Sequence, residues 1–199
     1  KLFSPDQFDA DIDKFILCFL KRDLSFKNPY IKFLKEYFRN GDISSLDELS
    51  TTIFNSVEKA LYNSPNEYIS FKLASILISK FINRNIWVDL LSQELAKQKD
   101  WVKYVDASIQ KKPPIWDFFP SQREAIRKGV LKINKTFSFQ MPTSAGKTAL
   151  CELIIYSEKV NHPDSKILFL APFRALASEL KAGFGKELAE LGVKSKTIY

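Results

Sequence analysis

The segment Met141-Pro-Thr-Ser-Ala-Gly-Lys-Thr148 constrains the fold of this chain more than any other stretch of its sequence. The short apolar run before it, residues 136–140, has the composition of a β-strand. The run after it, residues 149–156, has the apolar spacing of a helix. A glycine-containing loop between a strand and a helix leaves backbone N–H groups and the positive end of a helix dipole facing one point. That arrangement favours an anion there.

This layout is that of a phosphate-binding P-loop, in which Lys147 reaches the outer phosphates and the Thr148 hydroxyl holds Mg²⁺. One position departs from the usual pattern, because its first glycine falls on Met141. A Gly-Lys-Thr tripeptide alone also fits an ordinary strand-to-helix turn with a solvated lysine. We expect Lys147 and Thr148 to act in catalysis and the whole loop to bind nucleotide, through Pro142, Thr143, Ser144, Ala145, Gly146, Lys147 and Thr148.

A second strand-to-helix unit follows about 25 residues downstream of the loop. Residues 167–171 are continuously apolar, as expected of a strand buried on both faces. Pro172 ends this run, and apolar residues then recur at helical spacing up to Leu180. The order strand, loop, helix, strand, helix is a βαβ unit, which implies a parallel sheet. A third strand is expected at residues 194–199.

Three segments in this order resemble superfamily 2 helicases, and within them the Ski2-like branch. Residues 142–148 resemble motif I, which in that branch often begins Pro-Thr and lacks the first glycine. Residues 171–179, Ala-Pro-Phe-Arg-Ala-Leu-Ala-Ser-Glu, resemble motif Ia. Residues 116–126 resemble the Q-motif region, where a glutamine opens a helix just after a proline. The resemblance covers about residues 113–199 and implies the RecA-like core of an ATP-dependent nucleic-acid helicase.

The resemblance also implies roles for single residues. Gln122 would read the adenine of ATP, because its amide can pair with the N6 and N7 edge of the base. Phe118 or Phe119 could pack on the base, although core packing is the alternative for either. Pro172 and Arg174 would contact a phosphate of single-stranded nucleic acid, and the alternative for Arg174 is a solvated surface position.

A superfamily 2 ATPase also needs an Asp-Glu pair that holds Mg²⁺ and activates water. The one Asp-Glu dipeptide here, Asp47-Glu48, lies far upstream in a helical pattern, and we interpret it as a solvated helix face. We therefore expect the chain to be the N-terminal part of a longer helicase or translocase. By itself it should hydrolyse ATP poorly, because positioning and charge stabilisation supply most of phosphoryl-transfer catalysis.

Residues 1–112 have helical spacing throughout and no catalytic constellation. We expect five helices that pack as a bundle, near residues 4–20, 28–38, 44–61, 66–82 and 86–110, the last of them either straight or kinked. Residues 111–116 are interpreted as a linker, because paired prolines favour an extended chain. The predicted fold is thus an all-helical accessory domain at 1–112, followed at 113–199 by the first part of a RecA-like parallel-sheet P-loop domain.

Composition agrees with a folded protein that binds nucleic acid. Hydrophobic residues make up 45% of the 199 residues, which argues against disorder. The net charge is +7, and residues 113–199 carry 13 Lys and Arg against 8 Asp and Glu. A basic excess in that half favours a phosphate-backbone partner. The longest apolar run near the start, residues 15–20, is too short to span a membrane, so a cytoplasmic location is expected.

A second class of function stays open at this point. The helical domain could dock a partner protein while the P-loop part acts as a scaffold or switch. An accessory bundle ahead of a Ski2-like core is similar to bacterial defence or repair helicases such as the Hachiman type, which implies a role in antiviral defence. The sequence leaves open whether the single-stranded partner is DNA or RNA.

Overall fold

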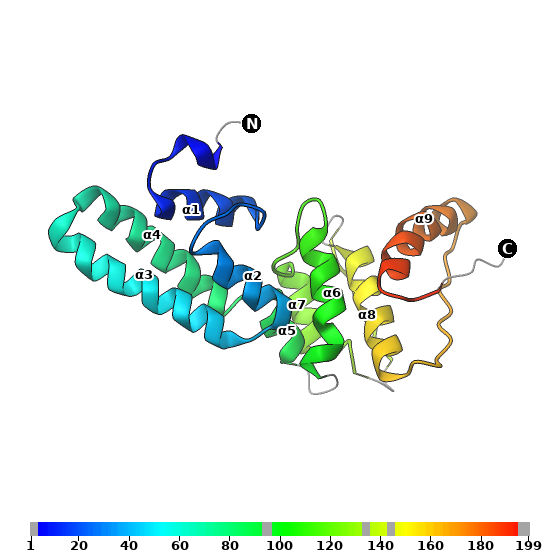
Figure 1. Ribbon diagram of the computed structural model, residues 1–199. Helices are drawn as coiled ribbons and strands as arrows, with labels where there is room; N and C mark the ends of the chain where they lie inside the picture. The colour runs from blue at the N-terminus through cyan, green and yellow to red at the C-terminus, as the bar shows by residue number, and fades with distance from the viewer. Residues whose placement is uncertain (1–3, 93–96, 133–135, 143–145, 195–199) are drawn as a thin grey trace. The chain divides into compact units, whose positions relative to one another are not determined.

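The computed structural model describes residues 4–92, 97–132, 136–142 and 146–194, and their regular structure is entirely helical. The prediction of a helical N-terminal part is thereby confirmed. None of the helices described is long and apolar enough to cross a lipid bilayer. The elements (Figure 1) are η1 (Pro5–Gln7), α1 (Asp11–Lys21), α2 (Ile31–Asn40), α3 (Ile43–Asn63), α4 (Pro65–Ile82), α5 (Ile86–Leu91), α6 (Gln98–Gln110), α7 (Pro120–Arg127), α8 (Lys147–Asn161) and α9 (Arg174–Glu190).

The chain divides into two compact units. The first unit contains Lys1–Val88 and Ser108–Asp117, and the second contains Asp89–Ala107 and Phe118–Tyr199. Helices α5 and α6 therefore contribute residues to both units. The division into domains at 1–112 and 113–199 stays a prediction.

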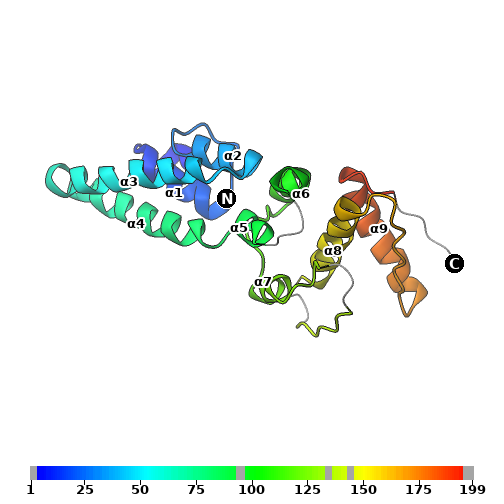
Figure 2. The same ribbon diagram turned by 90° about the horizontal axis from the view of Figure 1, so that it is seen from below.

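Local signals in the sequence set the helix ends of the first unit. Gly41 takes a left-handed conformation, with φ of 70°, and ends α2 as the Asn-Gly pair predicts. The first residue of α4 is Pro65, so α3 and α4 form a hairpin whose helices lie side by side in Figures 1 and 2. Asp42 caps α3 by accepting a hydrogen bond from the backbone N–H of Ser44 at 3.0 Å.

The core of the first unit contains a cluster of aromatic rings. The indole of Trp116 is 3% exposed, and its centroid lies 5.5, 5.1 and 5.9 Å from those of Phe19, Phe38 and Phe81. Trp116 therefore belongs to the core, and its interpretation as part of a linker is wrong. Burying a large aromatic side chain outweighs the extended-chain preference of the prolines before it.

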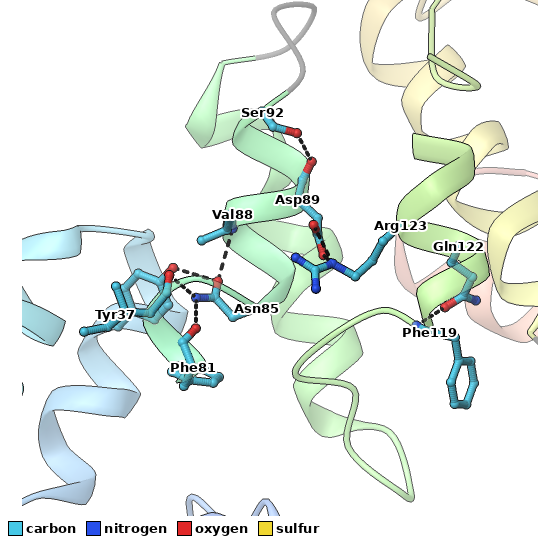
Figure 3. Close-up of polar contacts among 10 residues, drawn as sticks. Tyr37, Phe81, Asn85, Val88, Asp89, Ser92, Phe119, Gln122 and Arg123 are labelled. Carbon is cyan, nitrogen blue, oxygen red and sulfur yellow. Dashed lines mark hydrogen bonds and ion pairs between the residues drawn. The ribbon is translucent and has the colours of Figure 1, made fainter. Parts of the chain in front are cut away.

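Helix α5 begins at a buried polar cap. Asn85 is fully buried; its Oδ1 accepts hydrogen bonds from the Tyr37 hydroxyl at 2.7 Å and from Val88 N at 3.1 Å, and its Nδ2 donates to the Phe81 carbonyl at 2.8 Å (Figure 3). The single fifth helix predicted at residues 86–110 is two helices, α5 and α6. Apolar spacing continues across their junction and so does not reveal the break.

The helices of the second unit pack through aromatic and aliphatic side chains. Trp101 and Tyr104 of α6 lie against Tyr156 of α8, with ring centroids 5.6 and 5.4 Å from that of Tyr156. The Tyr156 hydroxyl donates to the Asp100 carbonyl at 2.7 Å. Further along the chain, Ile155 of α8 and Leu188 of α9 form a buried pair.

The expected parallel sheet is not formed in the residues that the structure describes. Residues 136–140 and 167–171 lie outside any strand, and residues 195–199 of the third expected strand lie outside the described residues. Leu168 and Leu170 are 76% and 81% exposed. A helix closes its hydrogen bonds internally, whereas a parallel strand needs a neighbour on each edge to do so. Strand-like composition alone therefore does not produce a strand here.

Candidate nucleotide-binding site

The conformation of Gly146 defines the start of α8. Its φ is 75°, in the left-handed region that favours glycine, and it is the residue immediately before the first helical residue, Lys147. A Cβ at this position would lie 2.3 Å from Nε2 of Gln122 and 3.2 Å from a ring carbon of Phe119. The backbone conformation thus favours glycine in the Gly-Lys-Thr motif, and a larger residue would also displace the amide of Gln122.

Gln122 joins the N-termini of two helices. Its Oε1 accepts a hydrogen bond from the backbone N–H of Phe119 at 2.9 Å, at the start of α7 (Figure 3). Its Nε2 donates to the carbonyl of Gly146 at 2.8 Å, and that carbonyl also accepts the first helical bond of α8, from Leu150 N at 3.0 Å. The side chain therefore fixes Gly146 relative to α7.

This contact to Gly146 differs from the role predicted for Gln122. The residue is 4% exposed, so the remaining hydrogen-bonding capacity of its amide is almost closed to solvent. Adenine reading by Gln122 stays a prediction. The bond to Phe119 follows a recognisable signal, a glutamine at the third position of a helix, whereas the bond to Gly146 has no signature in the sequence.

Lys147 and Thr148 are both exposed at the start of α8. The ammonium of Lys147 donates hydrogen bonds to the carbonyls of Met141 at 3.0 Å and Pro142 at 2.9 Å. Two of the three N–H donors of this ammonium are thus occupied within the chain. The remaining predicted loop residues, Thr143, Ser144 and Ala145, lie outside the described residues.

The structure distinguishes the two candidate aromatic residues. Phe118 is 5% exposed and belongs to the core, whereas Phe119 is 55% exposed next to Gly146. Of the two rings, the ring of Phe119 is therefore the one available to a base.

The residues predicted to contact nucleic acid lie at the start of α9. Pro172 is exposed, and Arg174, the first residue of that helix, is exposed as well. The helix start after Pro172 is confirmed. Asp47 and Glu48 are exposed on α3, which confirms that this dipeptide is a solvated helix face.

A buried ion pair lies beside the candidate site. Nε of Arg123 lies 2.9 Å from each carboxylate oxygen of Asp89, and the two side chains are 8% and 5% exposed. Asp89 is in α5 and Arg123 in α7, next to Gln122. The two residues are 34 positions apart, and no spacing rule in the sequence relates them.

The residues present fit a nucleotide phosphate with Mg²⁺. The N–H groups of the first turn of α8 have no partner within the helix, and the helix dipole adds a positive field at that end. Lys147 adds a cation, and Thr148 adds a hydroxyl of the kind that ligates Mg²⁺ in P-loops.

Comparison with known proteins identifies the class to which this site belongs. Residues 119–199 match the DEAD/DEAH box helicase family. The C-terminal part of the chain is therefore a piece of a superfamily 2 helicase domain, as its motifs predicted.

Three relatives show how the likeness is distributed. Hachiman protein HamB from Bacillus cereus is 28% identical over 164 residues, which is 82% of this chain and 14% of HamB. ATP-dependent DNA helicase Hel308 from Methanococcus vannielii is 35% identical over 79 residues, 38% of this chain and 10% of Hel308. DNA polymerase theta from Mus musculus is 36% identical over 76 residues, 38% of this chain and 3% of that protein. The chain thus spans a small part of each relative, and no solved structure matches it.

Proposed function

We propose that this chain is part of an ATP-dependent nucleic-acid helicase or translocase, which binds ATP and Mg²⁺ at the start of α8. The observation that carries the proposal is the left-handed Gly146 before Lys147 and Thr148, within the residues that match the helicase family. Pro142, Thr143, Ser144 and Ala145 complete the phosphate loop in this proposal. Pairing of residues 136–140 and 167–171 in a RecA-like sheet is also part of it, and such a sheet would cover the side chains of Leu168 and Leu170, which are exposed here.

Each residue at the start of α8 has a task in this function. The backbone N–H groups of the first turn bind phosphate oxygens, and Lys147 exchanges its two carbonyl acceptors for phosphate. Thr148 contributes its hydroxyl to Mg²⁺, which neutralises charge on the phosphates when it is bound. Water activation requires an Asp-Glu pair that this chain does not contain at a suitable position, because Asp47-Glu48 lies exposed on α3.

Substitution of Lys147 tests the proposal directly. In the full-length protein, Lys147→Ala should abolish ATP hydrolysis, because the cation that binds the outer phosphates is lost. The thermal stability should stay nearly constant, since the side chain is exposed. ATP turnover near the wild-type rate, measured as phosphate release, would contradict the proposal.

Arg174 and Pro172 form the proposed contact to single-stranded nucleic acid. Support comes from their exposure, from the helix start at Arg174 and from the basic excess of residues 113–199. Arg174→Ala should weaken binding of all single strands alike and lower the slope of log K against log salt by roughly 0.7, the loss of one phosphate contact. Titrations of labelled strands at several salt concentrations measure both quantities. An unchanged slope would leave Arg174 as a solvated surface residue.

Docking of a partner protein is the second candidate function. The observation that favours it is a row of exposed apolar side chains on α4, Ile69, Leu73 and Ile76, of which Ile69 is 68% exposed. Likeness to Hachiman protein HamB over 82% of the chain supports a role in antiviral defence within the same proposal.

A cytoplasmic location also stays a prediction. Asp substitution of Ile69 and Leu73 would test docking, because it should release the partner while leaving ATP hydrolysis intact.

A further inference from the structure

The buried ion pair beside the candidate site has a task beyond stability. We propose that Asp89 and Arg123 are positioning residues of the nucleotide site. Their ion pair fixes the orientation of α7, and α7 in turn fixes the first turn of α8 through Gln122. The inference rests on the proposed function, because it assigns these residues to the phosphate site at the start of α8.

The ion pair sets the orientation of α7 strongly because it is buried. Figure 3 shows Arg123 reaching from α7 to Asp89 on α5, with Nε 2.9 Å from each carboxylate oxygen. Charges that are excluded from water attract strongly and are unfavourable when separated. Rotation of α7 that moved Arg123 away would leave both charges buried and apart. The pair therefore tolerates little movement of the helix.

Gln122 carries that orientation to the phosphate site. It is the neighbour of Arg123 in sequence, and successive residues of a helix point about 100° apart, so α7 faces α5 with one side chain and α8 with the next. The bond from Gln122 Nε2 to the Gly146 carbonyl is 2.8 Å long. A shift of α7 by about 1 Å would lengthen this bond beyond hydrogen-bonding distance or displace the glycine.

Gly146 is a point where displacement matters. Its carbonyl accepts the first helical bond of α8, from Leu150, and its Cα is packed so closely on Gln122 that a Cβ would lie 2.3 Å from Nε2. The N–H groups that would hold phosphate follow directly in the chain. The direction of these N–H groups thus depends on a series of contacts. Asp89 holds Arg123, the neighbouring residue Gln122 lies on the same helix, and Gln122 holds Gly146.

A double-mutant cycle in the full-length protein tests whether Asp89 acts through Gln122. Asp89→Asn keeps the size of the side chain and removes its charge. We expect it to raise the Kd of the protein for a fluorescent ADP analogue, measured in the presence of Mg²⁺, by about tenfold. Gln122→Ala should raise this Kd by a similar factor, since each variant breaks one supporting contact. The Kd of the double variant should be no higher than that of the single variant with the higher Kd, because both changes interrupt the same series of contacts from Asp89 to Gly146.

The matched control is on the same helix. Glu124→Gln removes the pair between Glu124 and Lys128, whose side chains are 65% and 73% exposed, and it should leave the Kd unchanged. Melting curves show whether each variant is folded. If the ion pair were purely stabilising, its loss would lower the melting temperature and the fraction of protein that binds, but it would leave the Kd of the folded protein at the wild-type value.

Two results overturn the inference. One is a wild-type Kd for folded Asp89→Asn. The other is a double variant whose fold-increase in Kd equals the product of the fold-increases of the two single variants. If Asp89→Asn does not fold, the double variant Asp89→Leu/Arg123→Met replaces it, because apolar side chains remove both charges without leaving one of them buried and unpaired. An increased Kd in that folded variant supports the inference, and a wild-type Kd overturns it. Wild-type protein that binds no nucleotide overturns the proposed function and the inference with it, whereas tight wild-type binding with an unaffected Asp89 variant overturns the inference alone.

Discussion

Each α-helix of the first unit buries an apolar face, whereas the apolar side chains of the extended segments of the second unit, residues 136–140 and 167–171, are mostly exposed. In α2, Ile31, Leu34 and Phe38 are completely buried. In the segment before α9, Leu168 and Leu170 are 76% and 81% exposed although the run is just as apolar. A helix needs cover on one face only, and a neighbouring hairpin provides it, whereas a strand in a parallel sheet needs neighbours on both edges and both faces.

The difference is between kinds of segment and not between the two units. The second unit has its own firmly packed part, where Trp101, Tyr104 and Tyr156 form an aromatic cluster between α6 and α8. The buried pair of Asp89 and Arg123 belongs to the same unit. Completion of hydrogen bonds within a segment, more than distance along the chain, therefore decides which apolar residues are buried here.

Removal of the Trp116 indole should have the largest effect, because it acts on the packed side of this comparison. Trp116→Ala should lower the free energy of unfolding by about 3–5 kcal/mol, as the cavity would lie among Phe19, Phe38 and Phe81. Urea denaturation followed by far-ultraviolet circular dichroism measures the loss.

The matched control for Trp116 is an aromatic residue of the same unit on its surface. Tyr62 is 85% exposed on α3, and Tyr62→Ala should change the free energy of unfolding by less than about 0.5 kcal/mol. Equal losses for the two variants would show that residues 111–116 form a linker after all.

The helices of the first unit could be predicted because their signals are local. The Asn-Gly pair at 40–41 and the Ser-Pro pair at 64–65 gave the ends of α2 and α3 to within two residues. The buried stripe of α4 does not follow from its sequence pattern. Ala74 and Ile78 are buried and Ile69 is exposed, because α4 is apolar on almost every side and periodicity cannot select one stripe.

Comparison of two leucines in the second unit tests the difference within that unit. Leu153 of α8 is fully buried and Leu170 is 81% exposed. In the 199-residue chain, Leu153→Ala should cost about 2–5 kcal/mol of unfolding free energy and Leu170→Ala less than about 0.5 kcal/mol. Urea denaturation of both variants measures this contrast. A large cost for Leu170→Ala would show that residues 167–171 are packed in this chain.

The candidate site could be predicted only where its residues are close in sequence. Gly146, Lys147 and Thr148 follow from one tripeptide, and the structure puts them at the start of a helix as expected. The contacts that hold this tripeptide in place are long-range. Gln122 and Gly146 are 24 residues apart, and Asp89 and Arg123 are 34 apart, so they depend on how α5, α7 and α8 pack.

The smallest expected effect concerns the hydroxyl of Tyr156. Its titration shows whether the packed helices of the second unit exclude water as those of the first unit do. Burial, and to a lesser degree the negative charge of Asp100, raise the pKa of Tyr156 to about 12. The ordinary pKa of a tyrosine is about 10. The folded state thus holds the phenol proton more tightly than the unfolded state, and the resulting stability is present below about pH 10 and lost as the pH rises toward about 12.

Tyr156→Phe removes this titration together with the hydrogen bond to the Asp100 carbonyl. Near neutral pH the variant should be less stable by about 0.5–1.5 kcal/mol, the usual contribution of one such bond. Its urea midpoint should then fall less steeply than that of the wild-type protein between neutral pH and about pH 11. Tyr62→Phe, at an exposed site on α3, should retain the wild-type slope. If Tyr156→Phe also retained it, the contact between α6 and α8 would be open to water, and the packed helices of the second unit would resemble its extended segments more than the core of the first.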